Sequence, residues 1–399
     1  MKADWKKQGP AFLVGAGHGA THWIIATFYV LLPFVAKELD LSYTQTGGLV
    51  SLFHGSAFLA NLGSGAVVDI SGRRVLVQAT AITIGAGALA ALGLATNILW
   101  LLAPVIFIGI TNNLWHPAAI SYLSRKFPNS RGLALSIHTT GASIGDILAP
   151  VIAGSLLLSI SWQQTAVLNA VPIFVISAFL LILLKEIRIP QKQQPETGQK
   201  SGYLSGVVSL LRDPSLIGLC IMSGFRAMTQ NGLLLFLPLY LVVVLEANPL
   251  MLGIALMAFQ AGGIFAAPLA GAWSDRIGRQ PVVLTGLTAT SVLVLSLTFV
   301  DGLIPFIFLV SLLGFTLFSL RPVIHSWVMD LADDDLSGTA VSVLFSAQSA
   351  FTFAVPLLGG MIADVWGLKV VFYLLTLTIV IATLISMRLR QPQSYTKGR

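Results

Sequence analysis

The chain has few charged residues and almost no cysteine. Of its 399 residues only 10% are Asp, Glu, Lys or Arg, whereas 55% are hydrophobic. Soluble domains usually carry about 25% charged residues, so most of this surface must face lipid rather than water. The single cysteine, Cys220, excludes an internal disulfide and says nothing about the redox compartment.

Several enzyme motifs are also absent. The sequence contains no Gly-x-x-x-x-Gly-Lys-Ser/Thr run, no His-Glu-x-x-His and no paired cysteine motif. We therefore expect no ATP site, no cofactor and no enzymatic activity. The net charge of +7 does not indicate a nucleic-acid partner, because basic residues are expected in the cytoplasmic loops of membrane proteins.

Long apolar stretches take up most of the chain. A membrane-spanning helix needs about 20 apolar residues, and a barrel strand needs far fewer. Twelve stretches are long enough, at residues 11–36, 45–68, 75–95, 98–124, 132–158, 164–184, 215–245, 249–273, 281–300, 303–330, 338–362 and 367–388. They predict an all-α polytopic membrane protein with twelve transmembrane helices, the first of them a retained span rather than a cleaved leader.

The basic residues predict the orientation of these spans. If the N-terminus is cytoplasmic, 19 of the 23 Lys and Arg residues lie in cytoplasmic segments. Only Lys37 and Lys369 then lie outside, while Arg226 and Arg321 lie within spans. Because cytoplasmic loops are enriched in Lys and Arg, we expect both termini in the cytoplasm and the chain in the inner (cytoplasmic) membrane.

The chain divides into two halves of six spans each. A polar segment with two prolines and mixed charges predicts a cytoplasmic linker at 185–213, between bundles at 1–184 and 214–399. The halves also share a motif: Gly65-x-x-x-Asp69-x-x-Gly72-Arg73-Arg74 returns 206 residues later as Gly271-x-x-x-Asp275-x-x-Gly278-Arg279-Gln280. A parallel repeat of six spans indicates a duplication.

The repeated loop and the twelve spans resemble the major facilitator superfamily over nearly the whole chain. The resemblance implies a transporter in which two helical bundles rock around a central cavity. It also implies a latch at the cytoplasmic side, formed by Asp69, Gly72, Arg73, Asp275, Gly278 and Arg279. One copy of the loop is equally well explained as ordinary cytoplasmic charge, but two copies in register favour the latch.

The fifth span contains a second motif. Gly141, Gly145, Pro150 and Gly154 resemble the antiporter signature of drug–proton exporters, although two positions that usually hold Gly hold Ala here. Small residues four apart also let helices approach closely in any polytopic protein. The motif therefore favours export, with ordinary helix packing as the alternative.

A narrower resemblance is to the fosmidomycin-resistance exporters. It depends on three short segments: Gly17-His18-x-x-x-His22, Tyr43-Thr44-Gln45 and His116-Pro117. In that group an acidic residue often follows shortly after the His-Pro pair, whereas this chain has Ala118 and Ala119. The departure weakens a transfer of the substrate or of the coupling residues from that group.

Asp146 is the only carboxylate well inside a predicted span. It lies eight residues after His138, so the two side chains point within about 80° of each other, two helical turns apart. A charge in the hydrocarbon costs about 2.5–3.5 kcal/mol on insertion scales, which favours a functional role. We expect Asp146 to carry protons, with a structural hydrogen bond as the alternative.

All six histidines lie in predicted spans: His18, His22, His54, His116, His138 and His325. Because histidine titrates near physiological pH, we expect His18, His22 and His138 to carry protons with Asp146. His18 and His22 share a helix face at i, i+4, a spacing also found in metal sites. No Cys, Asp or Glu stands beside this pair in the sequence, so we expect no metal site; metal binding and helix packing are the alternatives.

Two permanently charged residues, Arg226 and Arg321, lie within spans. A guanidinium binds a carboxylate or phosphonate through two parallel hydrogen bonds, and the superfamily resemblance implies that spans 1, 4, 7 and 10 line the cavity. We therefore expect the substrate to contact Arg226, Arg321, His116, His325, Trp115 and Trp23. The alternative is that one arginine pairs with Asp146 or with backbone carbonyls.

These features predict a monomeric, proton-coupled exporter (an antiporter) of small anionic or amphipathic compounds. Its partners are then the substrate, protons and the lipid bilayer, and its energy comes from an ion gradient. The first alternative is a proton-coupled importer or a facilitator of an organic anion or metabolite, and a transition-metal transporter is less favoured. A metal-dependent membrane enzyme or a receptor is the third, and the repeated loop argues against it.

Overall fold

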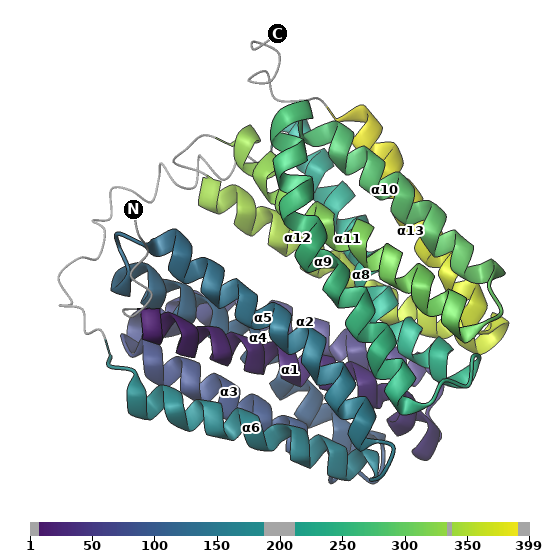
Figure 1. Cartoon of the computed structure of the whole chain (residues 1–399), viewed down its shortest axis with the longest axis horizontal. Helices are drawn as coiled ribbons and strands as arrows, with labels where there is room; N and C mark the ends of the chain where they lie inside the picture. Colours follow the sequence, from purple (N-terminus) through teal and green to yellow (C-terminus); the bar gives the residue numbers. More distant parts are fainter. Residues whose placement is uncertain (1–7, 187–211, 333–336, 390–399) are drawn as a thin grey trace. The chain divides into compact units, whose positions relative to one another are not determined.

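The computed structural model describes residues 8–186, 212–332 and 337–389. Within these ranges the chain forms twelve α-helices (Figure 1): α1 (Gly9–Glu38), α2 (Tyr43–Ser71), α3 (Arg74–Leu92), α4 (Ile98–Lys126), α5 (Arg131–Leu156), α6 (Trp162–Leu183), α8 (Pro214–Val243), α9 (Pro249–Ile277), α10 (Arg279–Ser296), α11 (Leu303–Leu331), α12 (Ser337–Trp366) and α13 (Leu368–Arg388). A short 3-10 helix, η2 (Leu297–Phe299), follows α10. Each predicted span coincides with one α-helix, so the predicted all-α fold is confirmed.

Ten of these helices are long and apolar enough to cross a membrane. Helices α2 and α5 have 29 and 26 residues but are more polar than the other ten. The polar residues of α5 include His138 and Asp146, which belong to the candidate site. Polar residues in membrane helices usually face other helices or water rather than lipid.

The chain divides into two compact units by its internal contacts. One unit comprises Met1–Ile189 with Pro238–Met257, and the other comprises Pro190–Leu237 with Ala258–Arg399. The predicted linker at 185–213 falls almost entirely outside the described residues, so the predicted division into 1–184, 185–213 and 214–399 stays a prediction.

Short polar motifs start two helices of the first unit. Before α2, the Ser42 hydroxyl accepts from the Gln45 backbone N–H at 3.1 Å, and the Gln45 side chain accepts from the Ser42 N–H at 2.9 Å. Ser161 and Gln164 form the same reciprocal pair before α6. This capping box satisfies backbone donors that a helix start leaves unpaired, so Tyr43-Thr44-Gln45 has a local structural role.

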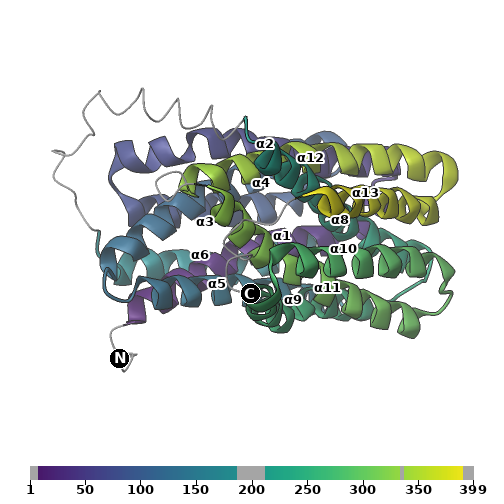
Figure 2. The ribbon, with the colours of Figure 1, turned by 90° about the horizontal axis from the view of Figure 1, so that it is seen from above.

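Helix α1 lies at the centre of the first unit, where it contacts α2 to α6 (Figures 1 and 2). Its closest approach is to α5, at two pairs of glycines. A Cβ on Gly141 would lie 2.9 Å from the Cα of Gly15, and one on Gly19 would lie 2.8 Å from the carbonyl oxygen of Gly141. Gly145 faces Gly19 in the same way. Gly141 and Gly145 of the antiporter-like motif therefore form part of the α1–α5 packing surface, as small residues allow.

In the second unit, α10 packs against α11 and α13, and α12 contacts both of these helices. Fully buried aromatic side chains fill its core, among them Trp327, Phe306 and Phe372. Helices α9 and α11 approach through Gly314, where a Cβ would lie 2.9 Å from the Cα of Phe259. Both units thus use glycine at a close helix crossing.

Candidate functional site

Four histidines and one aspartate from three helices meet in the first unit. We call them the histidine cluster: His18 and His22 of α1, His116 of α4, and His138 and Asp146 of α5. His18 is the centre. Its ring stacks on His138 with the centroids 3.9 Å apart and makes edge contacts with His22 at 4.8 Å and His116 at 5.0 Å. Sequence reasoning assigned His116 to the substrate site, but the structure places it beside His18.

Backbone carbonyls determine the tautomers of two cluster histidines. Nδ1 of His18 lies 2.9 Å from the His138 carbonyl oxygen, and Nδ1 of His116 lies 2.8 Å from the Asn112 carbonyl oxygen. A carbonyl only accepts, so each Nδ1 donates, and in a neutral ring Nε2 is then the acceptor. The two Nε2 atoms lie 3.3 Å apart with their lone pairs facing each other. Attraction at this spacing requires a cation between them, either a proton or a metal ion.

The His22–Asp146 pair is the more accessible part of the cluster. His22 Nδ1 and Asp146 Oδ2 are 3.0 Å apart, and the side chains are 23% and 25% exposed. His18, in contrast, is buried. The Asp146 carboxylate therefore has an imidazole as its hydrogen-bond partner, and both side chains are partly exposed.

A basic cluster lies in the second unit. Arg226 of α8 is only 3% exposed. Its Nη1 donates to the Gln230 side chain at 2.9 Å and to the Leu317 carbonyl oxygen at 3.4 Å. Within the described residues its Nε has no hydrogen-bond partner. The charge of Arg321 on α11 acts on both Arg226 and His325.

The Arg226 guanidinium contacts an amide and a carbonyl, and no carboxylate in the described part of the chain forms an ion pair with it. Leaving a buried charge without a counter-ion is strongly destabilising. An anionic ligand would supply that counter-ion. In the alternative, backbone carbonyls bind the guanidinium instead, but among the described residues only the Leu317 carbonyl oxygen does so.

The second copy of the repeated loop is built around Arg279. Its Nε donates to Asp330 Oδ2 at 2.9 Å, and its Nη1 donates to Ser274 Oγ at 2.7 Å and to the Asp275 carboxylate. The preceding residue, Gly278, has a φ of +98°, which side chains disfavour. Arg279 thus joins the end of α9 to the end of α11, as a latch within one unit would.

The first copy is arranged differently. Gly72 ends α2 with a φ of +61°, which explains the glycine at this position. Arg73 and Asp69 are exposed, whereas Arg74 is 1% exposed and donates from Nε to Ser121 Oγ at 2.9 Å. The buried arginine is therefore one position later than in the second copy.

The two tryptophans differ in their surroundings. Trp23 donates from Nε1 to Asn169 Oδ1 at 2.8 Å. Trp115 is completely buried, and its ring occupies the space that a side chain at Gly17 would need. Neither residue has an established contact with a substrate, so this role stays a prediction.

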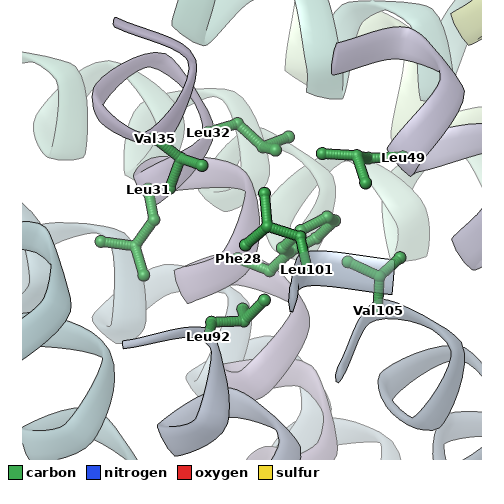
Figure 3. A pocket seen from close by; sticks show the side chains of 8 residues that line it. All are labelled: Phe28, Leu31, Leu32, Val35, Leu49, Leu92, Leu101 and Val105. Atoms are coloured by element: carbon green, nitrogen blue, oxygen red, sulfur yellow. The ribbon is translucent and has the colours of Figure 1, made fainter. Parts of the chain in front are cut away.

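A small apolar cavity lies in the first unit, and no residue of the histidine cluster lines it (Figure 3). Its lining contains no polar side chain: Phe28, Leu31, Leu32, Val35, Leu49, Leu92, Leu101 and Val105. Without a hydrogen-bonding group it cannot orient an anion or a proton donor, so we treat it as a packing defect.

Sequence reasoning missed three partners of the predicted residues, namely Asn112, Asn169 and Asp330. It also missed the buried arginine of the first loop copy, Arg74. Asn169 lies within an apolar stretch, and its rarity there was an available signal. Asp330 gave none, because it lies at the end of a span, where charges are common. The 206-residue register aligns Arg73 with Arg279, so the sequence favoured Arg73 over Arg74 as the latch arginine. Only burial in the structure distinguishes the two arginines.

Known proteins with similar sequences are transporters. The chain matches the model of the Major Facilitator Superfamily at residues 12–251 and 219–398. It is 24% identical over 368 residues to the multidrug resistance protein MdtG of Escherichia coli, covering 87% of this chain and 86% of MdtG. The narrower resemblance to fosmidomycin-resistance exporters stays a prediction.

Solved structures with the same fold cover almost the whole chain. A bacterial homolog of the human lysosomal transporter Spinster has a TM-score of 0.84 at 16% identity and covers 100% of this chain and 99% of its own. The nucleoside transporter NupG has a TM-score of 0.80 at 13% identity and covers 96% and 100%. Identities this low support the fold alone. The match to the family model, together with the ten apolar helices, shows a multi-pass membrane protein rather than an enzyme.

Proposed function

The chain belongs to the Major Facilitator Superfamily, and on this premise we propose that it exports small anionic or amphipathic compounds in exchange for protons. As a member of that family it transports small molecules across a membrane. Proton coupling, direction and substrate class are the proposed parts. The name of its relative MdtG, a multidrug resistance protein, supports export of drug-like compounds.

The observation that carries proton coupling is the hydrogen bond between His22 and Asp146. A carboxylate and an imidazole 3.0 Å apart, each about a quarter exposed, can take up and release a proton without a large rearrangement. Both groups lie within membrane helices, where an ionisable side chain costs free energy, and this cost favours a functional role over a passive one. His18 and His138 extend the pair into the buried part of the unit, where they pass or stabilise the charge.

The basic cluster supports an anionic substrate. Arg226 has a buried guanidinium with an unpartnered Nε among the described residues, and the positive charge of Arg321 acts on both Arg226 and His325. A carboxylate, phosphate or phosphonate would gain charge-assisted hydrogen bonds there. We place substrate contact at these three residues and treat His116 as a member of the histidine cluster, with Trp23 and Trp115 as weaker candidates.

The same proposal includes orientation and gating. The basic residues favour an inner (cytoplasmic) membrane protein with both termini in the cytoplasm, acting as a monomer. Arg279, with Asp275 and Gly278, forms the latch of one unit, and Asp69, Gly72 and Arg73 form its counterpart in the other.

Proteoliposomes with an imposed pH gradient test the coupling. We expect the wild-type chain to move anionic compounds against the direction of proton flow, and Asp146→Asn to lose this pH-driven movement while still exchanging substrate between equal compartments. His54→Gln is the matched control, because His54 contacts Tyr29 rather than the cluster. Unchanged pH dependence in Asp146→Asn would refute the assignment. Protons and substrate moving in the same direction would support the importer instead.

A further inference from the structure

We infer that His18, His22 and His116 form a binding site for one divalent transition-metal ion. One ring nitrogen from each of the three residues lies within 4.8 Å of the corresponding atoms of the other two. This inference goes beyond the transport function, and it reverses the expectation from the sequence that the chain has no metal site. It depends on the distances and tautomers of the cluster and not on proton coupling.

The spacing of the ligand atoms fits a metal of this kind. Metal–nitrogen bonds of about 2.0–2.1 Å in a tetrahedral site place two nitrogens roughly 3.3 Å apart. The Nε2 atoms of His18 and His116 lie 3.3 Å apart. The third ring must then approach by up to about 1.5 Å, judged from the same ideal spacing. His22 is partly exposed, whereas His18 is buried, so a rotation of the His22 side chain can supply that approach.

The second nitrogen of each ring is already held by an oxygen. Nδ1 of His18 and of His116 donates to a backbone carbonyl, and Nδ1 of His22 lies 3.0 Å from the Asp146 carboxylate. Metal-binding histidines nearly always have such an outer partner, which sets the ring orientation and tautomer. The same three hydrogen bonds leave Nε2 as the ligand atom in each ring.

The donor set selects the class of metal. Three imidazoles suit borderline ions such as Zn²⁺, Ni²⁺, Cu²⁺ and Co²⁺, and exclude the oxygen-seeking Mg²⁺ and Ca²⁺. A three-histidine site leaves a fourth position for water or for a ligand group of a substrate. The exposed fractions of His22 and Asp146 show that this open side is accessible.

The ion would connect α1 to α4 through His18 and His116, which lie 98 residues apart in the sequence. Asp146 would act as a positioning residue, because it orients His22 from α5. His138 stacks on His18 and its carbonyl holds the His18 Nδ1, so it too acts through another residue.

The full-length chain, purified in detergent without a polyhistidine tag, is titrated with Zn²⁺ by calorimetry and with Co²⁺ by visible absorption. We expect one ion per chain, and Co²⁺ bands that indicate nitrogen ligands in a low-symmetry site. His116→Ala and His18→Ala should abolish these bands. Asp146→Asn should weaken binding about tenfold, as is usual for outer partners of metal ligands. His325→Ala, a histidine of the other unit, should bind as the wild type does.

Loss of folding is separated from loss of metal by a second measurement. Zn²⁺ should raise the unfolding temperature of the wild-type chain and of His325→Ala, and leave that of His116→Gln unchanged. A chain that takes up no ion, or whose Co²⁺ bands persist in both His18→Ala and His116→Ala, overturns the inference and leaves a shared proton between the two Nε2 atoms. Neither measurement requires transport, so failure of the export proposal would not affect this result.

Discussion

The substitution Gly141→Ala tests whether the α1–α5 glycine contact supports the histidine cluster. A Cβ at this position would lie 2.9 Å from the Cα of Gly15 and closer still to its carbonyl oxygen. Ordinary carbon contacts are about 3.5–4.0 Å, so α1 and α5 must separate by roughly 1 Å. Both neighbours are backbone atoms, which cannot rotate away as a flexible side chain would.

The expected cost is about 3 kcal/mol, at the upper end of the range for overpacked cores. It corresponds to a fall in unfolding temperature of roughly 6–12 °C for a unit of this size. The same separation lengthens the 3.0 Å hydrogen bond between His22 and Asp146, so pH-driven transport should fall together with stability. Gly145→Ala, one turn further along α5, should behave similarly.

Fluorescence-detected thermal unfolding in detergent measures the stability, and the proteoliposome assay measures transport. Gly87→Ala is the control, because Gly87 lies in α3 with nothing within 4 Å of a Cβ. Alanine favours helix by about 1 kcal/mol over glycine, so the control should be as stable as the wild type or more so. A Gly141→Ala chain that unfolds within 1 °C of the wild type, with normal transport, would refute the packing argument.

Two further predictions concern the second unit. Arg226→Lys retains the charge but loses the guanidinium group that can form two parallel hydrogen bonds, so the concentration of anionic compound for half-maximal transport should rise about tenfold. The concentration of neutral compound for half-maximal transport should stay constant. An equal change for both classes of compound would contradict contact between Arg226 and the anion. Arg279→Ala removes the contacts with Asp275 and Asp330 and should slow transport about tenfold, which corresponds to an activation free energy higher by about 1.4 kcal/mol. Arg276→Ala, at an exposed neighbouring position, should leave the transport rate unchanged. Wild-type rates in both variants would exclude the latch.

The fold was predictable because its determinants are local. Each membrane helix needs a long apolar stretch, and all twelve stretches found in the sequence coincide with helices of the described chain. Helix ends followed short motifs, such as the Ser42–Gln45 capping box and the left-handed Gly72. The least apolar helices, α2 and α5, were still recognised from the length of the stretches at 45–68 and 132–158.

The candidate site was only partly predictable. Asp146 and His138 were identified from their position inside a span, and the structure places both against α1, one beside His22 and the other on His18. The sequence could not show that His116 joins them, since a four-residue spacing reveals neighbours on one helix but not on another. For this reason a metal site seemed excluded until the third histidine was located.

The sequence by itself determined the membrane class, the number of helices and the internal repeat, because composition, stretch length and register are properties of neighbouring residues. Only the tertiary structure decided which side chains meet. His22 and Asp146 are 124 residues apart, and they meet because glycines on α1 and α5 let the two backbones touch. Burial, also a tertiary property, separates Arg74 from Arg73 and leaves Arg226 without a carboxylate partner in the described chain.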